Sequence, residues 1–326
     1  MDKNPVLLSI CCITYNHENY ISQAIEGFLA QKTSFNFEII IHDDASTDAT
    51  ASIVKKYEQE HPNLIKAIYQ KENQYSQGIK PWPNFVFPTA KGKYIALCEG
   101  DDYWTDPYKL QKQVDFLEHN KDYIICFHDV KINKHGELIN DDITRDVPES
   151  TSIIELAKGN YMHTPSVVFK RNWQELPSWF ALCPAGDYPL HMINAQFGKI
   201  KKLDEVMAVY RIHNSNIWAN QDNFRMSQNI HAYLHEMIDN FESEANEILK
   251  SRYLNITRNL IKKCLELNQR ETANYYLTRL VEKHPDSVLK SFLSDLQPPS
   301  TKVLAKALLD QVNYKVRNYF FKKKNA

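Results

Sequence analysis

Residues 6–44 read VLLSICCITYNHENYISQAIEGFLAQKTSFNFEIIIHDD, and their hydrophobic period changes twice. Residues 6–13 form a mostly apolar run, which is typical of a buried strand. Apolar side chains then recur at helical spacing over residues 19–29, and a second apolar run covers residues 37–41. Strand, helix and strand in this order predict a β-α-β unit with parallel strands.

The same alternation continues to about residue 220. Further strands are predicted over residues 64–69, 94–98, 124–130, 167–170 and 206–212, and helices over 48–57, 107–119 and 151–158, with another opening at 186–189. Residues 70–87 show no clear period and contain Gly78, Pro81 and Pro83, so we expect a long loop there. The pattern predicts an α/β fold with a mixed, mostly parallel, Rossmann-like sheet that becomes partly antiparallel after residue 124.

The β pattern stops near residue 221, and only helical periodicity follows to about residue 296. We therefore predict an α/β domain over 1–222, a helical region over 223–297 and a basic amphipathic tail over 298–326. The tail carries seven Lys and Arg residues against one Asp. Such a segment suits an anionic membrane surface, and the alternative is a helix docked on the protein's own core. The helical region is a candidate interface for a homo-oligomer.

Composition argues against several classes of protein. With 43% hydrophobic and 24% charged residues, the 326-residue chain resembles a globular protein with a sizeable core. Its 39 basic and 40 acidic residues nearly cancel, which argues against nucleic acid as a partner. The six cysteines form no C-x-x-C pair and predict neither a disulfide framework nor a zinc site. No signal peptide or membrane-spanning stretch is evident, so we expect a cytoplasmic protein that is peripheral on the inner membrane through its tail.

Acidic residues follow predicted strands at positions where α/β sheets bind ligands. Asp43 and Asp44 follow the second strand, Asp101 and Asp102 follow the fourth, and Asp187 lies at a helix start. Each cluster alone is more often a turn or a helix cap. Adjacent carboxylates repel each other and together suit a hard divalent cation, Mn²⁺ or Mg²⁺, which would bridge to a phosphorylated substrate. Glycine motifs of P-loop and dinucleotide sites are absent.

Four segments carry motifs in a characteristic order and spacing: Ser9–Asn16 (SICCITYN), His42–Asp48 (HDDASTD), Glu99–Trp104 (EGDDYW) and Gly186–Tyr188 (GDY). Together they resemble family 2 glycosyltransferases of the GT-A fold. Tyr210–His213 (YRIH), with Ser215 and Trp218, resembles the closing segment of that family. The match extends over about residues 5–220 and does not cover the helical remainder. The resemblance implies an inverting enzyme that uses a nucleotide-sugar donor and a divalent metal ion.

The resemblance also implies roles for individual residues. The donor site would comprise Ile13, Thr14, Tyr15, Asp44, Asn73, Asn84, Glu99, Asp101 and Arg211. The implied metal ligands are Asp101, Asp102 and His213. Glu99 replaces the first acid of the usual motif, which leaves open which of the three acids Glu99, Asp101 and Asp102 touches the metal. Asp187 aligns with the general base that deprotonates the acceptor hydroxyl.

Several of these residues also have a purely structural interpretation. Tyr15 and His213 can be packed or satisfied strand-end residues, and Arg211 can pair with a surface acid instead of the diphosphate. Trp104 either stacks on an acceptor sugar or packs beneath its loop. His163 either faces the acceptor or belongs to a structural turn.

Together with the basic tail, the resemblance implies metal-dependent transfer of a sugar from a UDP-sugar to a hydroxyl of a glycan or lipid-linked glycan in surface polysaccharide biosynthesis. A carboxylate base on the face opposite the leaving group implies direct displacement with inversion. One alternative is a catalytically inactive glycan- or nucleotide-binding subunit on the same fold. Another is a sugar-nucleotide pyrophosphorylase, which should carry a Gly-rich, basic loop where this chain has Thr14–Glu18.

Overall fold

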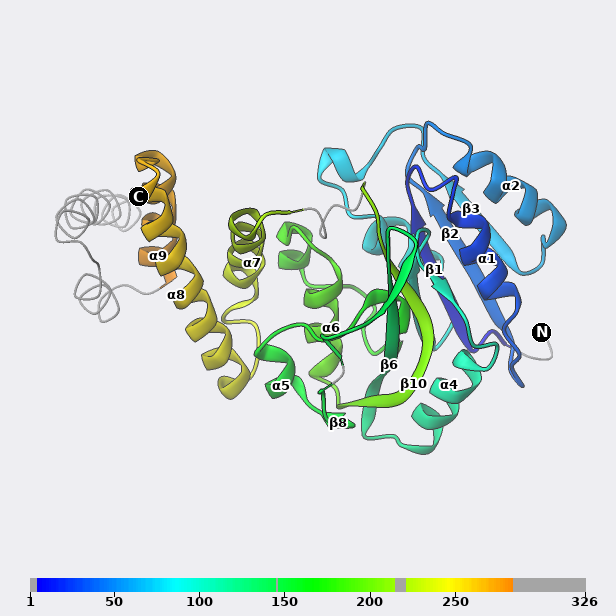
Figure 1. The fold of residues 1–326 in the computed structure, drawn as a ribbon. Helices are drawn as coiled ribbons and strands as arrows, with labels where there is room; N and C mark the ends of the chain where they lie inside the picture. Colours follow the sequence, from blue (N-terminus) through cyan, green and yellow to red (C-terminus); the bar gives the residue numbers. More distant parts are fainter. Residues whose placement is uncertain (1–4, 145, 215–220, 284–326) are drawn as a thin grey trace, which may run out of the picture. The chain divides into compact units, whose positions relative to one another are not determined.

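The structure is a computed structural model that describes residues 5–144, 146–214 and 221–283. The chain divides into two compact units, Met1–Asn220 and Gln221–Ala326. The first is an α/β unit and the second is helical (Figure 1).

The described part of the first unit contains ten strands in one sheet. They are β1 (Leu8–Thr14), β2 (Phe37–Asp43), β3 (Ile65–Tyr69), β4 (Tyr94–Glu99), β5 (Tyr103–Trp104), β6 (Tyr123–Lys134), β7 (Glu137–Asn140), β8 (Ser150–Thr151), β9 (Val168–Lys170) and β10 (Lys199–Ile212). Their order is β3-β2-β1-β4-β9-β6-β10-β5, with β7 paired to β6 and β8 to β10. β1 to β4 pair in parallel, as do β6 and β10, whereas β9 is antiparallel to both β4 and β6. The predicted α/β fold with a mixed, mostly parallel sheet is confirmed.

Helices cover both faces of this sheet. They are α1 (Ile21–Leu29), α2 (Thr50–Glu60), α3 (Phe87–Thr89), α4 (Lys109–His119), α5 (Ile153–Ala157) and α6 (Asp187–Ala195). α1 buries one apolar face, formed by Ile21, Ala24, Ile25 and Phe28, in the core that also contains Leu8, Ile10 and Cys12 of β1. Full burial of such side chains contributes about 1.5–3 kcal/mol each, which is why the apolar stripe dictates a helix here. α6 lies on the other side of the sheet from α1 (Figure 1).

The long loop expected over residues 70–87 is partly helical, so that prediction was wrong in part. The structure has η1 (Tyr75–Gln77) and η2 (Trp82–Val86) before α3, and further short helices at η3 (Thr164–Ser166) and η4 (Ser178–Leu182). Trp82, Val86 and Phe87 are buried, and these contacts outweigh the weak local pattern. Pro81 and Pro83 mark a helix start, where proline is tolerated because the first N–H groups have no helical partner.

β10 is longer than the sequence pattern predicted. It begins at Lys199, whereas the pattern indicated a strand only from residue 206. Its first half pairs with β6 through register shifts on either side of Val206. Such irregularities interrupt the two-residue alternation by which a strand is detected.

The described part of the second unit consists of α7 (Asn223–Met237), α8 (Ser243–Glu266) and α9 (Arg270–Lys283). Asn268, with a φ of 57°, allows the chain to reverse between α8 and α9. No helix among the described residues is long and apolar enough to cross a membrane. The predicted tail at 298–326 lies outside the described residues, as do Ser215 and Trp218.

Candidate functional site

The carboxyl ends of β1, β2 and β4 meet at one edge of the sheet. Thr14 pairs with Asp43 and Ile13 pairs with Glu99, so the loops that follow these strands are neighbours. The fit is close, because a Cβ added to Gly100 would lie 2.6 Å from Thr14 Oγ1. This is the edge at which α/β sheets bind ligands.

The loop after β1 is held by the segment that leads into α2. Asn16 has a φ of 55°, its backbone N–H donates to Ser46 Oγ at 2.9 Å, and its Oδ1 accepts from the Thr47 N–H at 2.8 Å. The backbone N–H of His17 donates to Thr50 Oγ1 at 2.8 Å. These bonds fix the direction in which the His17 side chain leaves the loop.

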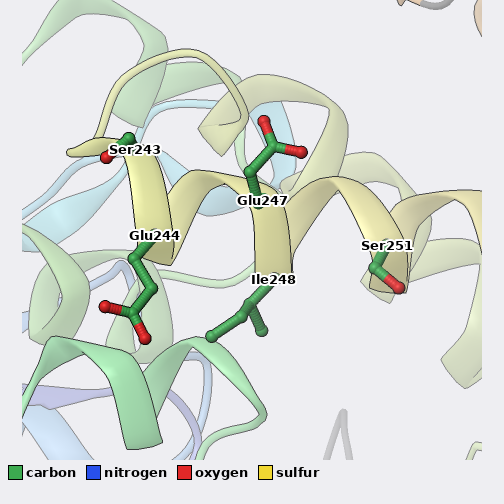
Figure 2. Close-up of a pocket in the computed structure, with 5 residues that line it drawn as sticks. All are labelled: Ser243, Glu244, Glu247, Ile248 and Ser251. Atoms are coloured by element: carbon green, nitrogen blue, oxygen red, sulfur yellow. The ribbon is translucent and has the colours of Figure 1, made fainter.

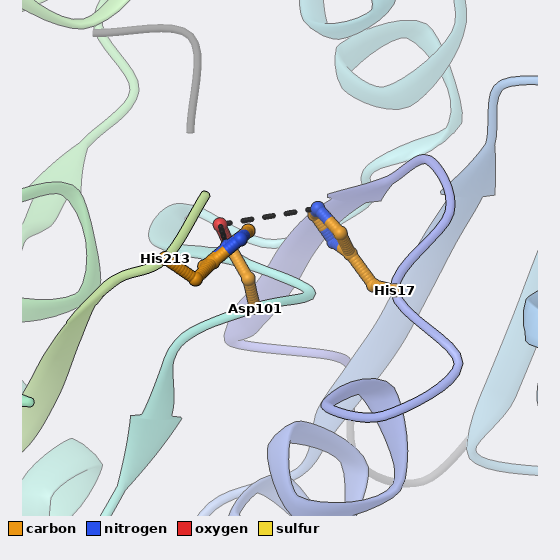
Figure 3. A group of neighbouring side chains, drawn as sticks. All are labelled: His17, Asp101 and His213. Carbon is orange, nitrogen blue, oxygen red and sulfur yellow. Dashed lines mark hydrogen bonds and ion pairs between the residues drawn. The ribbon is translucent and has the colours of Figure 1, made fainter. Parts of the chain in front are cut away.

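Three side chains from separate segments converge at this edge: His17 after β1, Asp101 after β4 and His213 after β10 (Figure 3). Nε2 of His213 lies 3.0 Å from Oδ2 of Asp101, and Nε2 of His17 lies 3.8 Å from the same oxygen. The three potential ligand atoms all lie within 4.8 Å of one another, so this set can hold a metal ion. The sequence pointed to Asp101 and His213 but missed His17, whose signal was its place three residues beyond a strand end on the ligand-binding edge.

The histidines control the protonation of Asp101. Burial raises the pKa of this carboxyl, but the hydrogen bond with His213 and the charges of His17 and His213 bring it below its usual value. Burial lowers the pKa of His17, against the opposing charge of Asp101. An ionised carboxylate and a neutral imidazole are the forms that bind metals.

Asp102 does not join this cluster. Its side chain is fully buried, and its Oδ1 accepts the backbone N–H of Arg211 at 2.8 Å. Burial raises its pKa, as do the charges of Asp101 and Glu99. Of the three acids between which the sequence left the metal ligand open, Asp101 is the one that faces both histidines.

Arg211 is oriented differently from the expected diphosphate contact. Its Nη1 donates to the Asp101 carbonyl, its Nη2 donates to Gln23 Oε1, and its guanidinium lies 5.0 and 4.4 Å from the ring centres of Tyr20 and Tyr103. With these partners and 8% exposure, the side chain supports the turn that carries Asp101. The diphosphate contact expected for Arg211 stays a prediction.

Two further carboxylates lie near the cluster. Burial raises the pKa of Glu99 to about 8, and the charges of Asp101 and Asp187 contribute to the rise. Asp187, at the start of α6, is therefore close enough to Glu99 for its charge to act there. Asn160 Nδ2 donates to Asp187 Oδ2 at 3.1 Å and orients that carboxylate.

Asp44 organises the segment that follows β3. Its Oδ1 accepts the N–H of Gln74 at 2.8 Å and its Oδ2 accepts that of Tyr75 at 3.0 Å, so the carboxylate caps η1. Asn73 Nδ2 donates to the Asp44 carbonyl at 3.2 Å, and its Oδ1 accepts the N–H of Ser76. Each carboxylate oxygen of Asp44 can accept one further hydrogen bond. A bond from the base of the nucleotide to Asp44 therefore stays a prediction.

The other donor-site residues differ in exposure. Ile13 is half-buried, and the Oγ1 of Thr14 is buried without a hydrogen-bond partner in the described part of the chain. Tyr15 is 42% exposed, which makes it available to a ligand. Asn84 is exposed on η2, and its Nδ2 donates to the carbonyl of Lys80, which precedes that helix, at 2.8 Å.

The sequence analysis left two interpretations of Trp104 open, and its surroundings favour packing. The side chain is 4% exposed, its Nε1 donates to the Pro165 carbonyl at 2.9 Å, and its ring packs against Phe28. It therefore packs beneath its loop and is not available to stack on an acceptor sugar. His163 is largely buried, and its Nε2 lies 3.1 Å from Asp141 Oδ1, so its acceptor role stays a prediction.

A shallow hollow in the helical unit offers no comparable chemistry. It is lined along α8 by Ser243, Glu244, Glu247, Ile248 and Ser251 (Figure 2). Two separate glutamates and an isoleucine form no convergent ligand set, so the sheet edge in the first unit is the candidate site.

Comparisons with known proteins identify the family that the first unit resembles. Residues 9–170 match the family model described as glycosyl transferase family 2. An uncharacterized protein of Mycobacterium tuberculosis (strain H37Rv) is 41% identical over 220 residues, which are 65% of this chain and 60% of that protein. The chain thus spans less than two thirds of the length of this relative.

Two further comparisons bear on activity and fold. The Escherichia coli protein WfaP, a UDP-Glc:α-D-GlcNAc-diphosphoundecaprenol β-1,3-glucosyltransferase, is 38% identical over 115 residues, which are 35% of this chain and 43% of that protein. The crystal structure of S. aureus TarS 1–349 with UDP-GlcNAc aligns with a TM-score of 0.65 at 17% identity, over 96% of this chain and 92% of TarS. At that identity the likeness shows the fold alone, and the predicted GT-A fold is confirmed.

Proposed function

The chain belongs to glycosyl transferase family 2 through residues 9–170, and on that premise we propose that it transfers a sugar from a nucleotide-sugar donor to a hydroxyl group. The observation that carries the proposal is the set of acids at the ligand edge of the sheet: Glu99 and Asp101 at the end of β4 lie beside two histidines, and the charge of Asp187 from α6 acts on Glu99. A binding module has no need of a carboxylate placed to accept a proton from an acceptor.

A UDP-sugar is the donor we propose. TarS, which shares the fold, has been crystallised with UDP-GlcNAc. In this chain, Thr14, Tyr15 and Asp44 lie at the ends of β1 and β2, where Tyr15 is exposed and Thr14 Oγ1 lacks a partner among the described residues. These groups are suited to bind the nucleoside part of such a donor.

A divalent cation fits the three ligand atoms of His17, Asp101 and His213. When bound, it would supply positive charge that stabilises the diphosphate as the sugar–phosphate bond breaks. The residues of the chain prepare this site: the Asp101 carboxylate is kept ionised by its histidine neighbours, and Arg211 holds the Asp101 carbonyl from below.

Asp187 is the general base that we propose. Its carboxylate would take the proton from the acceptor hydroxyl as the hydroxyl oxygen attacks the anomeric carbon and the nucleoside diphosphate leaves. Attack opposite the leaving group inverts the anomeric configuration. Asn160, which donates to Asp187 Oδ2, would hold the second carboxylate oxygen toward the acceptor.

The acceptor that we propose is a glycan or a lipid-linked glycan in the synthesis of a surface polysaccharide. Support comes from the relative WfaP, whose acceptor is a diphosphoundecaprenol-linked sugar. Peripheral membrane contact through residues 298–326 is part of the proposal, since a basic amphipathic segment suits anionic headgroups.

Asp187→Asn tests the assignment of the base. We expect UDP binding by calorimetry to stay within about twofold of wild type, while turnover falls by about 10²-fold or more, the usual contribution of a general base. Asp204→Asn, at an exposed position on β10, is the matched control and should leave both quantities unchanged. Near-normal turnover of the Asp187 variant would remove Asp187 from the mechanism.

A further inference from the structure

We propose that His17 is a third protein ligand of the cation, and that His17, Asp101 and His213 together select a first-row transition ion over Mg²⁺. The inference deepens the proposed function, on which it rests for the role of the ion. Ion binding itself is a separate property that can be measured without turnover.

The first observation is that His17 faces Asp101 without bonding to it. Its Nε2 lies 3.8 Å from Asp101 Oδ2, which is too long for a hydrogen bond, whereas His213 bonds the same oxygen at 3.0 Å. Figure 3 shows both rings directed toward the Asp101 carboxylate. Ligand bonds of about 2.0–2.2 Å separate donor atoms around one cation by roughly 3–4.4 Å, so these spacings need little adjustment.

The second observation is that the position of His17 is fixed before any ion binds. Its backbone N–H donates to Thr50 Oγ1, and its carbonyl accepts the N–H groups of Tyr20 and Ile21 at 2.9 and 2.8 Å. The left-handed Asn16 just before it is tied to Ser46. A residue that only filled space at the mouth of the site would not need a backbone held both by the start of α1 and by the segment that leads into α2.

The third observation concerns the other acids. Asp102 Oδ1 accepts the Arg211 N–H, and the described structure brings neither Asp102 nor Glu99 into the three-residue set. The protein ligands are thus two imidazole nitrogens and one carboxylate. Mg²⁺ prefers oxygen ligands, whereas imidazole suits ions such as Fe²⁺, Co²⁺ and Zn²⁺, and Mn²⁺ accepts both.

Titration of the full-length protein with Mn²⁺, followed by electron paramagnetic resonance of the free ion, measures this site directly. We expect His17→Ala to weaken Mn²⁺ binding by about tenfold or more, comparable to His213→Ala, because a ligand is lost. His119→Ala, on the exposed end of α4, is the control and should bind as wild type does. Co²⁺ should displace Mn²⁺ at similar concentration, and Mg²⁺ should fail to do so at about a hundredfold excess.

Pulsed resonance separates ligation from a general electrostatic effect. The modulation of the Mn²⁺ spin echo by coordinated imidazole nitrogen should correspond to two histidine rings in wild type. It should correspond to one ring in both His17→Ala and His17→Gln. Thermal unfolding shows whether either variant is folded. If neither variant folds, the number of coordinated histidine rings in wild type still tests the inference. A single ring in wild type, unchanged affinity in a folded His17 variant, or displacement by equimolar Mg²⁺ would overturn the inference. Sugar transfer that survives such a result would leave the proposed function standing with a different metal site.

Discussion

Arg211→Lys tests whether this residue supports the site or binds the donor. In the structure the guanidinium bonds the Asp101 carbonyl and Gln23 and lies between the rings of Tyr20 and Tyr103. Lysine keeps the positive charge but has one ammonium group in place of the planar fork. It can keep one of the two hydrogen bonds and loses most of the stacking on the rings.

The size of the effect follows from these contacts. A lost hydrogen bond to a charged group costs about 1.5–3 kcal/mol, and the weakened cation–π contacts add about 0.5–1 kcal/mol. We therefore expect the free energy of unfolding of the first unit to fall by about 2–4 kcal/mol. Because the guanidinium is engaged by the Asp101 carbonyl and Gln23, UDP affinity in the folded variant should change by less than about threefold.

Urea unfolding followed by tryptophan fluorescence isolates the first unit, since all five tryptophans precede residue 221. Calorimetric titration with UDP and Mn²⁺ gives the affinity. Arg270→Lys, exposed at the start of α9, controls for the chemical change. An unchanged unfolding curve together with UDP binding weakened by tenfold or more would refute the supporting role and restore the diphosphate contact expected from the sequence.

Three further predictions concern the stability of the two units. Gly100→Ala should lower the free energy of unfolding by about 1–3 kcal/mol through overpacking, because its Cβ would lie 2.6 Å from Thr14 Oγ1 and 2.8 Å from Thr14 Cβ. An unshifted urea midpoint would contradict this geometry. Trp104→Ala should lower the free energy of unfolding by about 3–5 kcal/mol, as truncation of a core residue does. If Trp104 instead stacked on an acceptor sugar, the variant would lose activity and keep its stability. In the helical unit, burial, with a further contribution from the Arg279 charge, lowers the pKa of His231 to about 4 and that of His235 to about 3. In the unfolded chain these histidines bind protons near pH 6.5, so the free energy of unfolding should be greatest above that pH and should fall as the pH decreases toward 4. Thermal melts of His235→Gln should show a smaller fall than those of wild type. An equal pH dependence of the two proteins would contradict this role of His235.

Most of the α/β architecture was predictable because it depends on local periodicity. Residues 6–44 alternate between strand and helix patterns that match β1, α1 and β2, and the loss of β pattern near residue 221 coincides with the start of the helical unit. The segment from η1 to α3 was not predictable in this way. Its helices depend on the burial of Trp82, Val86 and Phe87 against distant parts of the chain.

The site was predictable as a set of acids at strand ends, to which the family resemblance added His213. The structure was needed to show which acid faces which partner, because Asp101 and Asp102 are adjacent in sequence yet turn toward His213 and the Arg211 backbone respectively. His17 was missed because its proximity to Asp101 spans 84 residues of sequence. The hydrogen-bond partners of Arg211 were not predictable, because a motif gives the residue type but not the direction of the side chain.

The most direct test of the central claim is the release of UDP from a panel of UDP-sugars by the full-length protein with Mn²⁺, with and without EDTA, for wild type and Asp101→Asn. We expect slow hydrolysis of one donor, which EDTA abolishes and which the variant lacks. If no donor is hydrolysed and UDP does not bind in the presence of Mn²⁺, the claim of glycosyl transfer is contradicted and an inactive binding subunit is favoured.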